Sequence, residues 1–137
     1  MLNKTTTLYR PVGLTEYKLI QDSGYQRFPP RLDWQPIFYP VLNEKYACEI
    51  AQQWNTKDAF SGHIGIVTAF EIPTHYFNTF EVQNVGGTLH NELWVPAHRL
   101  DTFNQNIVGI IKVTQVFYGA SFTGEKINLN NDTITKK

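Results

Sequence analysis

The segment from His63 to Pro73, HIGIVTAFEIP, restricts the fold more than any other part of the sequence. Apolar side chains recur at alternate positions along it, with one interruption at Thr68. A period of two is typical of a strand, because successive side chains of a strand point to opposite faces of its sheet. We expect a long strand of a largely antiparallel sheet here.

The first forty residues predict two short strands around a short helix. TLYRPVG predicts a strand at Leu8–Arg10 that stops at the turn Pro11–Gly13. The next stretch has apolar residues at helical spacing, with Thr15 as the expected N-cap and Gly24 as the stop signal. PIFYPV, residues 36–41, predicts the second strand.

A clear amphipathic helix follows, with Asn43 as its expected N-cap. Its apolar face consists of Tyr46, Ala47, Ile50, Ala51 and Trp54. Three further strands are expected at 81–85, 92–95 and 110–118, with a short helix from the proline at position 96 between the last two. The order of these elements predicts an α+β fold of small, curved, mostly antiparallel sheets with short helices packed on them.

Composition and length favour a single packed domain. The chain has 137 residues, of which 42% are hydrophobic and 14% aromatic, enough for a core without covalent cross-links. We expect this domain over residues 1–120. Residues 121–137 are polar and rich in Asn, Lys and Thr, and we expect them to form a flexible C-terminal tail.

The net charge argues against nucleic acid as a partner. Twelve basic residues are balanced by twelve acidic ones, so the protein lacks the positive field that a phosphate backbone would require. A small ligand or a protein is the expected partner. With one cysteine, no apolar leader and no run of about 18 apolar residues, the sequence is typical of a cytoplasmic protein that does not enter the membrane.

A metal site is not expected, although His90 and Glu92 match the H-x-E half of a zinc deaminase motif. That motif also needs a downstream pair of cysteines, and the single cysteine, Cys48, lies upstream on the predicted helix. We expect Cys48 to be a buried free thiol. The glycine-rich motifs of dinucleotide and P-loop folds are missing as well.

Glu92 stands out because it opens a strand-like run, HNELWVP, directly after a glycine pair. It can protect a sheet edge, or it can act as a catalytic group in a cleft. The residues themselves leave both interpretations open. The proline-rich loop 25–36 is expected to form a wall of that cleft, with Phe28 and Trp34 as flat surfaces for a ligand.

Three segments in fixed order resemble the ADP-ribosyltransferase fold: LYRPVG, IFYPVLNEKYACEIA and HNELWVP. The chain is also similar to short bacterial proteins labelled "ADP-ribosylation/crystallin J1", over about 8–118. The crystallin J1 half of that label denotes an all-helical, metal-dependent hydrolase. It does not suit this strand-rich sequence.

The resemblance implies NAD as the substrate and assigns roles to single residues. Arg10 would contact the NAD phosphates or ribose, and Tyr39 would lie at the nicotinamide pocket, with Tyr46 as a stacking neighbour. Glu92 would bind the nicotinamide ribose and stabilise the positive charge as the glycosidic bond breaks. Independently of the resemblance, the loop 25–36 would add Trp34 as a stacking surface for the nucleotide.

His90 occupies the position where transferases acting on arginine-type acceptors carry Gln or Glu, so it is the candidate acceptor-selecting or catalytic neighbour of Glu92. The Ser-Thr-Ser segment of the arginine-type enzymes is missing here. Two functions follow. One is transfer of ADP-ribose from NAD, or hydrolysis of NAD. The other is a non-enzymatic module of the same fold that binds a ligand or a protein.

Overall fold

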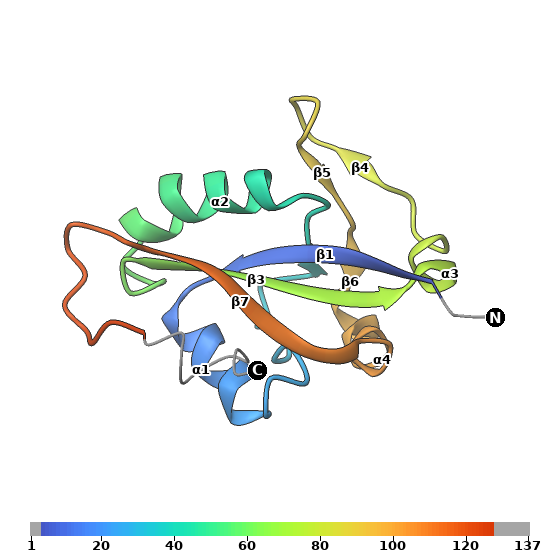
Figure 1. The fold of residues 1–137 in the computed structure, drawn as a ribbon, viewed down its shortest axis with the longest axis horizontal. Coiled ribbons are helices and arrows are strands. Elements are labelled where there is room, and N and C mark those ends of the chain that lie inside the picture. Colours follow the sequence, from blue (N-terminus) through green and yellow to red (C-terminus); the bar gives the residue numbers. More distant parts are fainter. Residues whose placement is uncertain (1–3, 128–137) are drawn as a thin grey trace.

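The computed structural model of the chain describes residues 4–127. Its main sheet consists of three long antiparallel strands, β1 (Thr5–Val12), β3 (Ile64–Pro73) and β7 (Val108–Tyr118). Figure 1 shows β3 running between β1 and β7. With helices packed around antiparallel sheets, the α+β class predicted from the sequence is confirmed.

The segment whose apolar residues alternate, residues 63–73, contains the central strand β3. Both faces of this strand are buried over its first five residues. Every residue from Ile64 to Thr68 is buried, so the alternation does not mark an exposed face. Helix α1 (Leu14–Asp22) shares the larger core cluster with Ile64 and Ile66, whereas α2 (Glu44–Gln53) shares a second cluster with Val67. The two helices thus pack against opposite sides of β3.

Helix α2 forms where the sequence predicts it. The side chain of Asn43 accepts a hydrogen bond from the Tyr46 backbone N–H at 2.8 Å, so the predicted N-cap is confirmed. The helix lies very close to the sheet, because a Cβ at Gly65 would come within 2.7 Å of the Cβ of Ala51. Only a glycine allows this approach.

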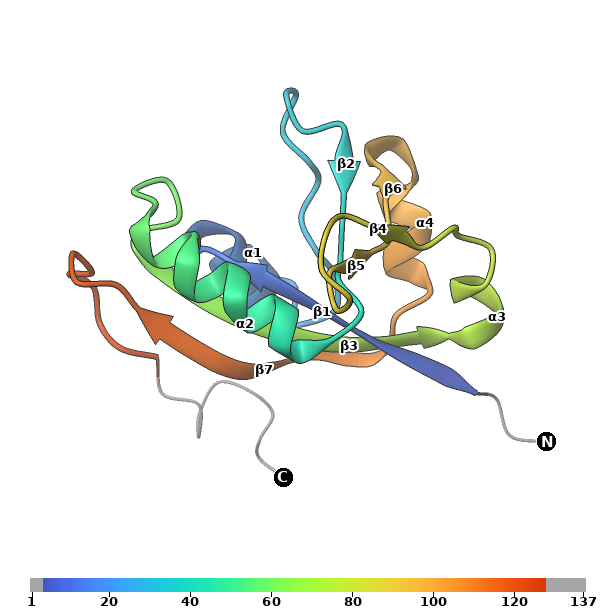
Figure 2. The same cartoon turned by 90° about the horizontal axis from the view of Figure 1, so that it is seen from above.

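Two pairs of short strands form a second layer beside the main sheet (Figure 2). Strand β2 (Ile37–Phe38) pairs with β6 (Val95–Pro96), and β4 (Gln83–Asn84) pairs with β5 (Asn91–Glu92). The expected single strand 92–95 is therefore divided between two partners. Val41 connects this layer to the main sheet, since it forms isolated bridges with Tyr9 of β1 and with Glu92 of β5.

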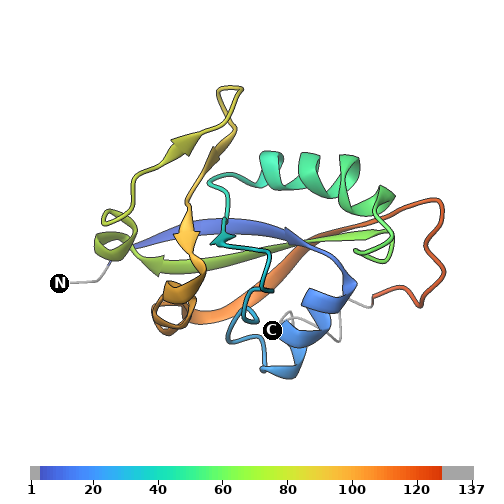
Figure 3. The ribbon, with the colours of Figure 1, turned by 180° about the vertical axis from the view of Figure 1, so that it is seen from behind.

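The short helices complete the described chain: η1 (Asn55–Lys57), α3 (Thr74–Phe77), η2 (Ala97–Arg99) and α4 (Leu100–Gln105), as Figure 3 shows for α3 and α4 from behind. The N-cap expected at Thr15 is wrong, because Gly13 precedes the helix and Leu14 already belongs to it. Strand β1 also continues through Pro11, which a strand at the edge of a sheet tolerates.

No helix within residues 4–127 combines the length and the apolar character needed to cross a membrane. Of the predicted C-terminal tail, Phe122 and Ile127 pack against the larger core cluster. Residues 128–137 of that tail lie outside the described residues.

Candidate functional site

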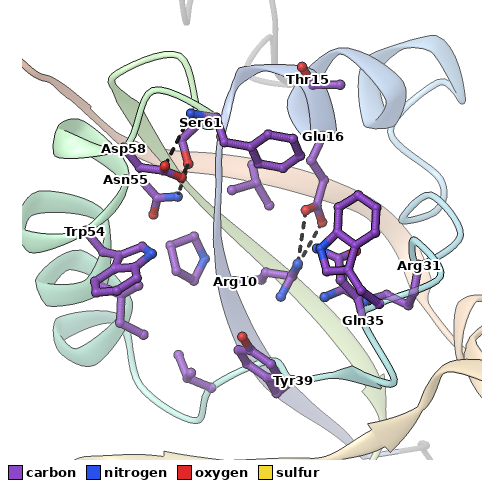
Figure 4. Close-up of a pocket in the computed structure, with 17 residues that line it drawn as sticks. Arg10, Thr15, Glu16, Arg31, Gln35, Tyr39, Trp54, Asn55, Asp58 and Ser61 are labelled. Carbon is purple, nitrogen blue, oxygen red and sulfur yellow. Dashed lines mark hydrogen bonds and ion pairs between the residues drawn. The ribbon is translucent and has the colours of Figure 1, made fainter. Parts of the chain in front are cut away.

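A pocket of about 310 Å³ lies along β1, where the chain leaves the strand for α1 (Figure 4). We call it the arginine pocket. Its walls come from β1, the start of α1, the loop before β2, the end of α2 and the turn before β3. The side chains used below are Arg10, Glu16, Arg31, Trp34, Tyr39, Val41, Trp54, Asn55, Asp58, Phe60 and Ser61.

Arg10 is almost fully buried and held in a fixed orientation. Its Nε and Nη2 donate to the two carboxylate oxygens of Glu16, at 2.8 and 3.0 Å. Its guanidinium carbon lies 4.7 Å from the centre of the Phe38 ring. The ion pair uses two of the guanidinium N–H groups, so the others stay available for an anion such as phosphate.

Arg31 places a second guanidinium near the first. Burial lowers the pKa of Arg31, and the positive charge of Arg10 lowers it further, while Glu16 and Tyr39 act in the opposite direction. Its Nε donates to the backbone oxygen of Ile37 at 3.2 Å. Within residues 4–127 Arg31 has no ion-pair partner, and a bound anion would relieve the repulsion between the two cations.

Aromatic side chains line the same pocket although solvent reaches them. Trp34, Trp54 and Phe60 are each about 70% exposed, and Tyr39 is 45% exposed. Large apolar side chains at this exposure, gathered around one pocket, offer flat faces on which a planar ligand can stack. The pocket therefore combines stacking surfaces with cationic hydrogen-bond donors.

Glu92 lies in a separate group that we call the Glu92 cluster: Tyr46, Glu49, His90, Glu92 and Trp94. The Tyr46 hydroxyl donates to one oxygen of Glu92 at 2.6 Å, and the Trp94 indole N–H donates to the other at 2.9 Å. His90 stacks on the Tyr46 ring with centroids 4.4 Å apart, and its Nε2 lies 3.0 Å from Glu49. Both carboxylate oxygens of Glu92 thus have fixed partners.

Burial raises the pKa of Tyr46, and the hydrogen bond to Glu92 and the charge of Glu92 raise it further. The hydroxyl therefore keeps its proton and remains a donor to the carboxylate. Smaller contributions come from Glu49 and from Tyr39, which lines the arginine pocket.

The two regions meet at Val41. This residue lines the arginine pocket and pairs directly with Glu92 across two antiparallel strands. Directly opposed residues point to the same face, with Cβ atoms about 5 Å apart. The carboxylate of Glu92 therefore lies one strand away from the pocket, although it does not line the pocket itself.

The predicted site residues accordingly fall into two groups. Arg10, Trp34 and Tyr39, from three separate segments, line the arginine pocket. Tyr46, His90 and Glu92 meet in the Glu92 cluster. Of the two aromatics expected in the loop wall, Phe28 lies in the core against Phe38 and Phe70 instead.

Sequence reasoning missed several lining residues: Glu16, Arg31, Trp54, Asn55, Asp58, Phe60 and Ser61. Five of them belong to the turn between α2 and β3, WNTKDAFSG, where two large aromatics stand among polar residues. Aromatic residues in such a polar turn are the signal that points to a ligand surface. Arg31 directly follows two prolines, whose fixed φ angles stiffen the loop that leads to it.

Among the residues described by the structure, no three His, Cys, Asp or Glu side chains gather as they would around a metal ion. Comparison with protein-family models, with curated proteins and with solved structures finds no match to this chain.

Proposed function

We propose that the arginine pocket binds NAD, and that the protein cleaves the bond between nicotinamide and ribose, either by hydrolysis or by transfer of ADP-ribose to an acceptor. One observation carries this proposal. Arg10 and Tyr39, two of the residues to which the resemblance gives NAD-binding roles, lie around one pocket together with Trp34, which the sequence places in the wall of the cleft. In the same proposal the protein works in the cytoplasm.

The charges and surfaces of the pocket suit a dinucleotide. Two guanidinium groups, of which one has no carboxylate partner in residues 4–127, suit the diphosphate. The exposed rings suit the planar bases. A volume of about 310 Å³ falls at the small end of ligand pockets, so part of a bound NAD would extend past the rim.

Glu92 supplies the negative charge that the chemistry needs. Loss of nicotinamide leaves a positive charge on the ribose, and a fixed carboxylate nearby stabilises this transition state. In hydrolysis, water adds to the ribose carbon, the electron pair of the broken bond goes to nicotinamide, and one proton is released. Because Glu92 lies one strand from Val41, the nicotinamide riboside would extend from Tyr39 toward Glu92.

One feature favours a second function, that of a binding module without catalysis. Glu92 is only 9% exposed, does not line the pocket and already accepts two hydrogen bonds. A carboxylate held in this way also has a purely structural use, since it joins β5 to α2 and to Trp94. In that function the arginine pocket still binds the nucleotide.

Two measurements on the purified protein test the proposal: binding of NAD by calorimetry, and release of nicotinamide over time. Arg10→Lys keeps the charge but loses the paired donors, so we expect NAD to bind about tenfold more weakly. The matched control is Lys18→Arg on the exposed side of α1, which should change nothing. Binding without release supports the binding module, and absence of NAD binding rejects both functions.

A further inference from the structure

One end of the arginine pocket contains a polar group that the proposed function leaves without a role. Asn55 donates through Nδ2 to the Ser61 hydroxyl at 3.0 Å, and this hydroxyl donates to Asp58 at 2.8 Å. Figure 4 shows the three side chains on the other side of Arg10 from Arg31. All three line the pocket.

Among the described residues, this end of the pocket offers hydrogen-bond acceptors and no cationic side chain. Asp58 accepts from Ser61 and, at 3.2 Å, from the backbone N–H of Phe60, which leaves further lone pairs on its carboxylate. It forms no ion pair within the described residues. The half-buried carboxylate can therefore accept hydrogen bonds from a ligand that enters the pocket.

Asn55 adds a second, independent sign of a ligand. This residue is only 9% exposed, and its amide oxygen is buried without a hydrogen-bond partner in the part of the chain that the structure describes. Buried acceptors are almost always satisfied in native proteins, by the protein itself or by a bound group. This oxygen lacks a donor among residues 4–127, and a bound ligand can supply one.

The rings of Trp54 and Phe60, next to Asn55 and Ser61 in the sequence, indicate the shape of a ligand at this end of the pocket. Trp54 precedes Asn55, Phe60 precedes Ser61, and both rings line the pocket while about 70% exposed. A flat group that enters between such rings and the polar residues must carry N–H donors on its edge. The exocyclic amino group of adenine has this character, whereas phosphate and ribose ring oxygens do not.

Building on the proposed function, we propose that Asn55, Asp58 and Ser61 form the adenine end of the NAD site, with the amino group of adenine donating to Asp58. The arginines then hold the diphosphate in the middle of the pocket. The nicotinamide ring also carries an amide donor, but its positively charged ribosyl bond has to lie near Glu92. Glu92 adjoins the pocket at Val41, next to Tyr39, and Figure 4 shows Tyr39 on the other side of Arg10 from Asp58.

The test compares two ligands that differ only in the amino group, AMP and purine riboside 5′-monophosphate. A hydrogen bond to a charged acceptor makes a difference of about tenfold or more, so calorimetry should show AMP binding at least about tenfold more tightly. In Asp58→Asn this ratio should fall by at least about threefold, because the carboxylate charge is lost. The matched control Asp22→Asn, at the exposed end of α1, should keep the ratio of the wild type.

The outcomes separate this inference from the proposed function. If both monophosphates bind equally and Arg10→Lys weakens both, the adenine assignment is overturned while nucleotide binding stands. If NAD binds and AMP does not, the adenine assignment is again overturned. If NAD, AMP and ADP-ribose all fail to bind, the proposed function is overturned as well. The ratio in the wild-type protein decides the question even if Asp58→Asn does not fold.

Discussion

The arginine pocket and the Glu92 cluster differ in how many of their charged side chains have a partner, although Arg10 and Glu16 form an ion pair in the pocket. In the pocket, Arg31 and Asp58 have no ion-pair partner within residues 4–127, and large rings stand exposed. In the cluster, Glu92 is buried and both of its oxygens accept hydrogen bonds. Unused donors, acceptors and rings are what a ligand needs, whereas a fully bonded carboxylate is fixed in position. This difference supports the proposal that the pocket binds the ligand while the cluster orients a single charge.

The largest effect that separates the two regions is expected from Glu92→Gln. The amide keeps the size of the side chain and removes the charge that stabilises the transition state, so nicotinamide release should fall by about 100-fold or more. NAD binding, measured by calorimetry, should change by less than about threefold. Glu81→Gln, an exposed glutamate before β4, serves as the control. Unchanged release would remove Glu92 from the mechanism.

Two tryptophan variants should produce opposite results. Trp94→Phe deletes the indole N–H that donates to Glu92, and we expect nicotinamide release to fall about tenfold with NAD affinity unchanged. Trp34→Phe shrinks a ring of the pocket, and we expect NAD affinity to fall about threefold with kcat unchanged. Quenching of tryptophan fluorescence by NAD should decrease in Trp34→Phe. If both variants change the same parameter, the division between binding and catalysis is wrong.

Gly13→Ala should change the shape of the arginine pocket and leave the Glu92 cluster unchanged. A Cβ at Gly13 would lie 2.6 Å from the Cα of Ser61, so the turn before β3 has to move. We expect a cost of about 1–3 kcal/mol in the free energy of unfolding, and an NAD affinity reduced about fivefold. Gly87→Ala beside the cluster is the control, because its Cβ would meet His90 at an ordinary 3.4 Å. Equal effects from both variants would contradict this prediction.

The smallest effect concerns alkaline pH. The folded protein raises the pKa of Tyr46 above its ordinary value of 10.0, so it holds the proton more tightly than the unfolded chain does. This contribution to stability is complete below about pH 10 and is lost as the pH rises toward the folded pKa. Thermal unfolding between pH 8 and 11 should show a shallower decline for Tyr46→Phe than for the wild type. An identical slope would mean that Tyr46 titrates normally.

Sequence patterns predicted the helices and strands best where an element depends only on residues close to it in the sequence. The Asn43 cap depends on one side chain and its own helix, and the long strand at 64–73 was found from its apolar residues, although its burial does not alternate along the first five positions. The start of α1 depends instead on a distant partner, because the Leu14 N–H donates to the Ser61 backbone oxygen. A local pattern does not contain that contact, so the expected cap at Thr15 was wrong.

The site was partly predictable for a similar reason. Tyr39 directly follows β2, as expected of a residue at a strand end, whereas β1 continues for two residues past Arg10; both side chains line the pocket. That Glu92 would lie next to Val41 instead of inside the pocket depends on a single bridge between residues that are far apart in sequence. Asn55 and Asp58 belong to a turn whose position follows from the packing of α2 on β3.

The double attachment of residues 40–42 sets a length for any ligand that touches both regions. On one side Val41 exchanges backbone hydrogen bonds with Tyr9, and on the other Leu42 and Pro40 bond to Asn91 and Leu93. Sliding Glu92 away from Arg10 would break these bonds, so the gap between the two regions is rigid. Under the proposed function, this fixed gap would select ligands by the distance between their two bases. Dinucleotides with one or three phosphates should therefore fit worse than those with two, even with identical bases.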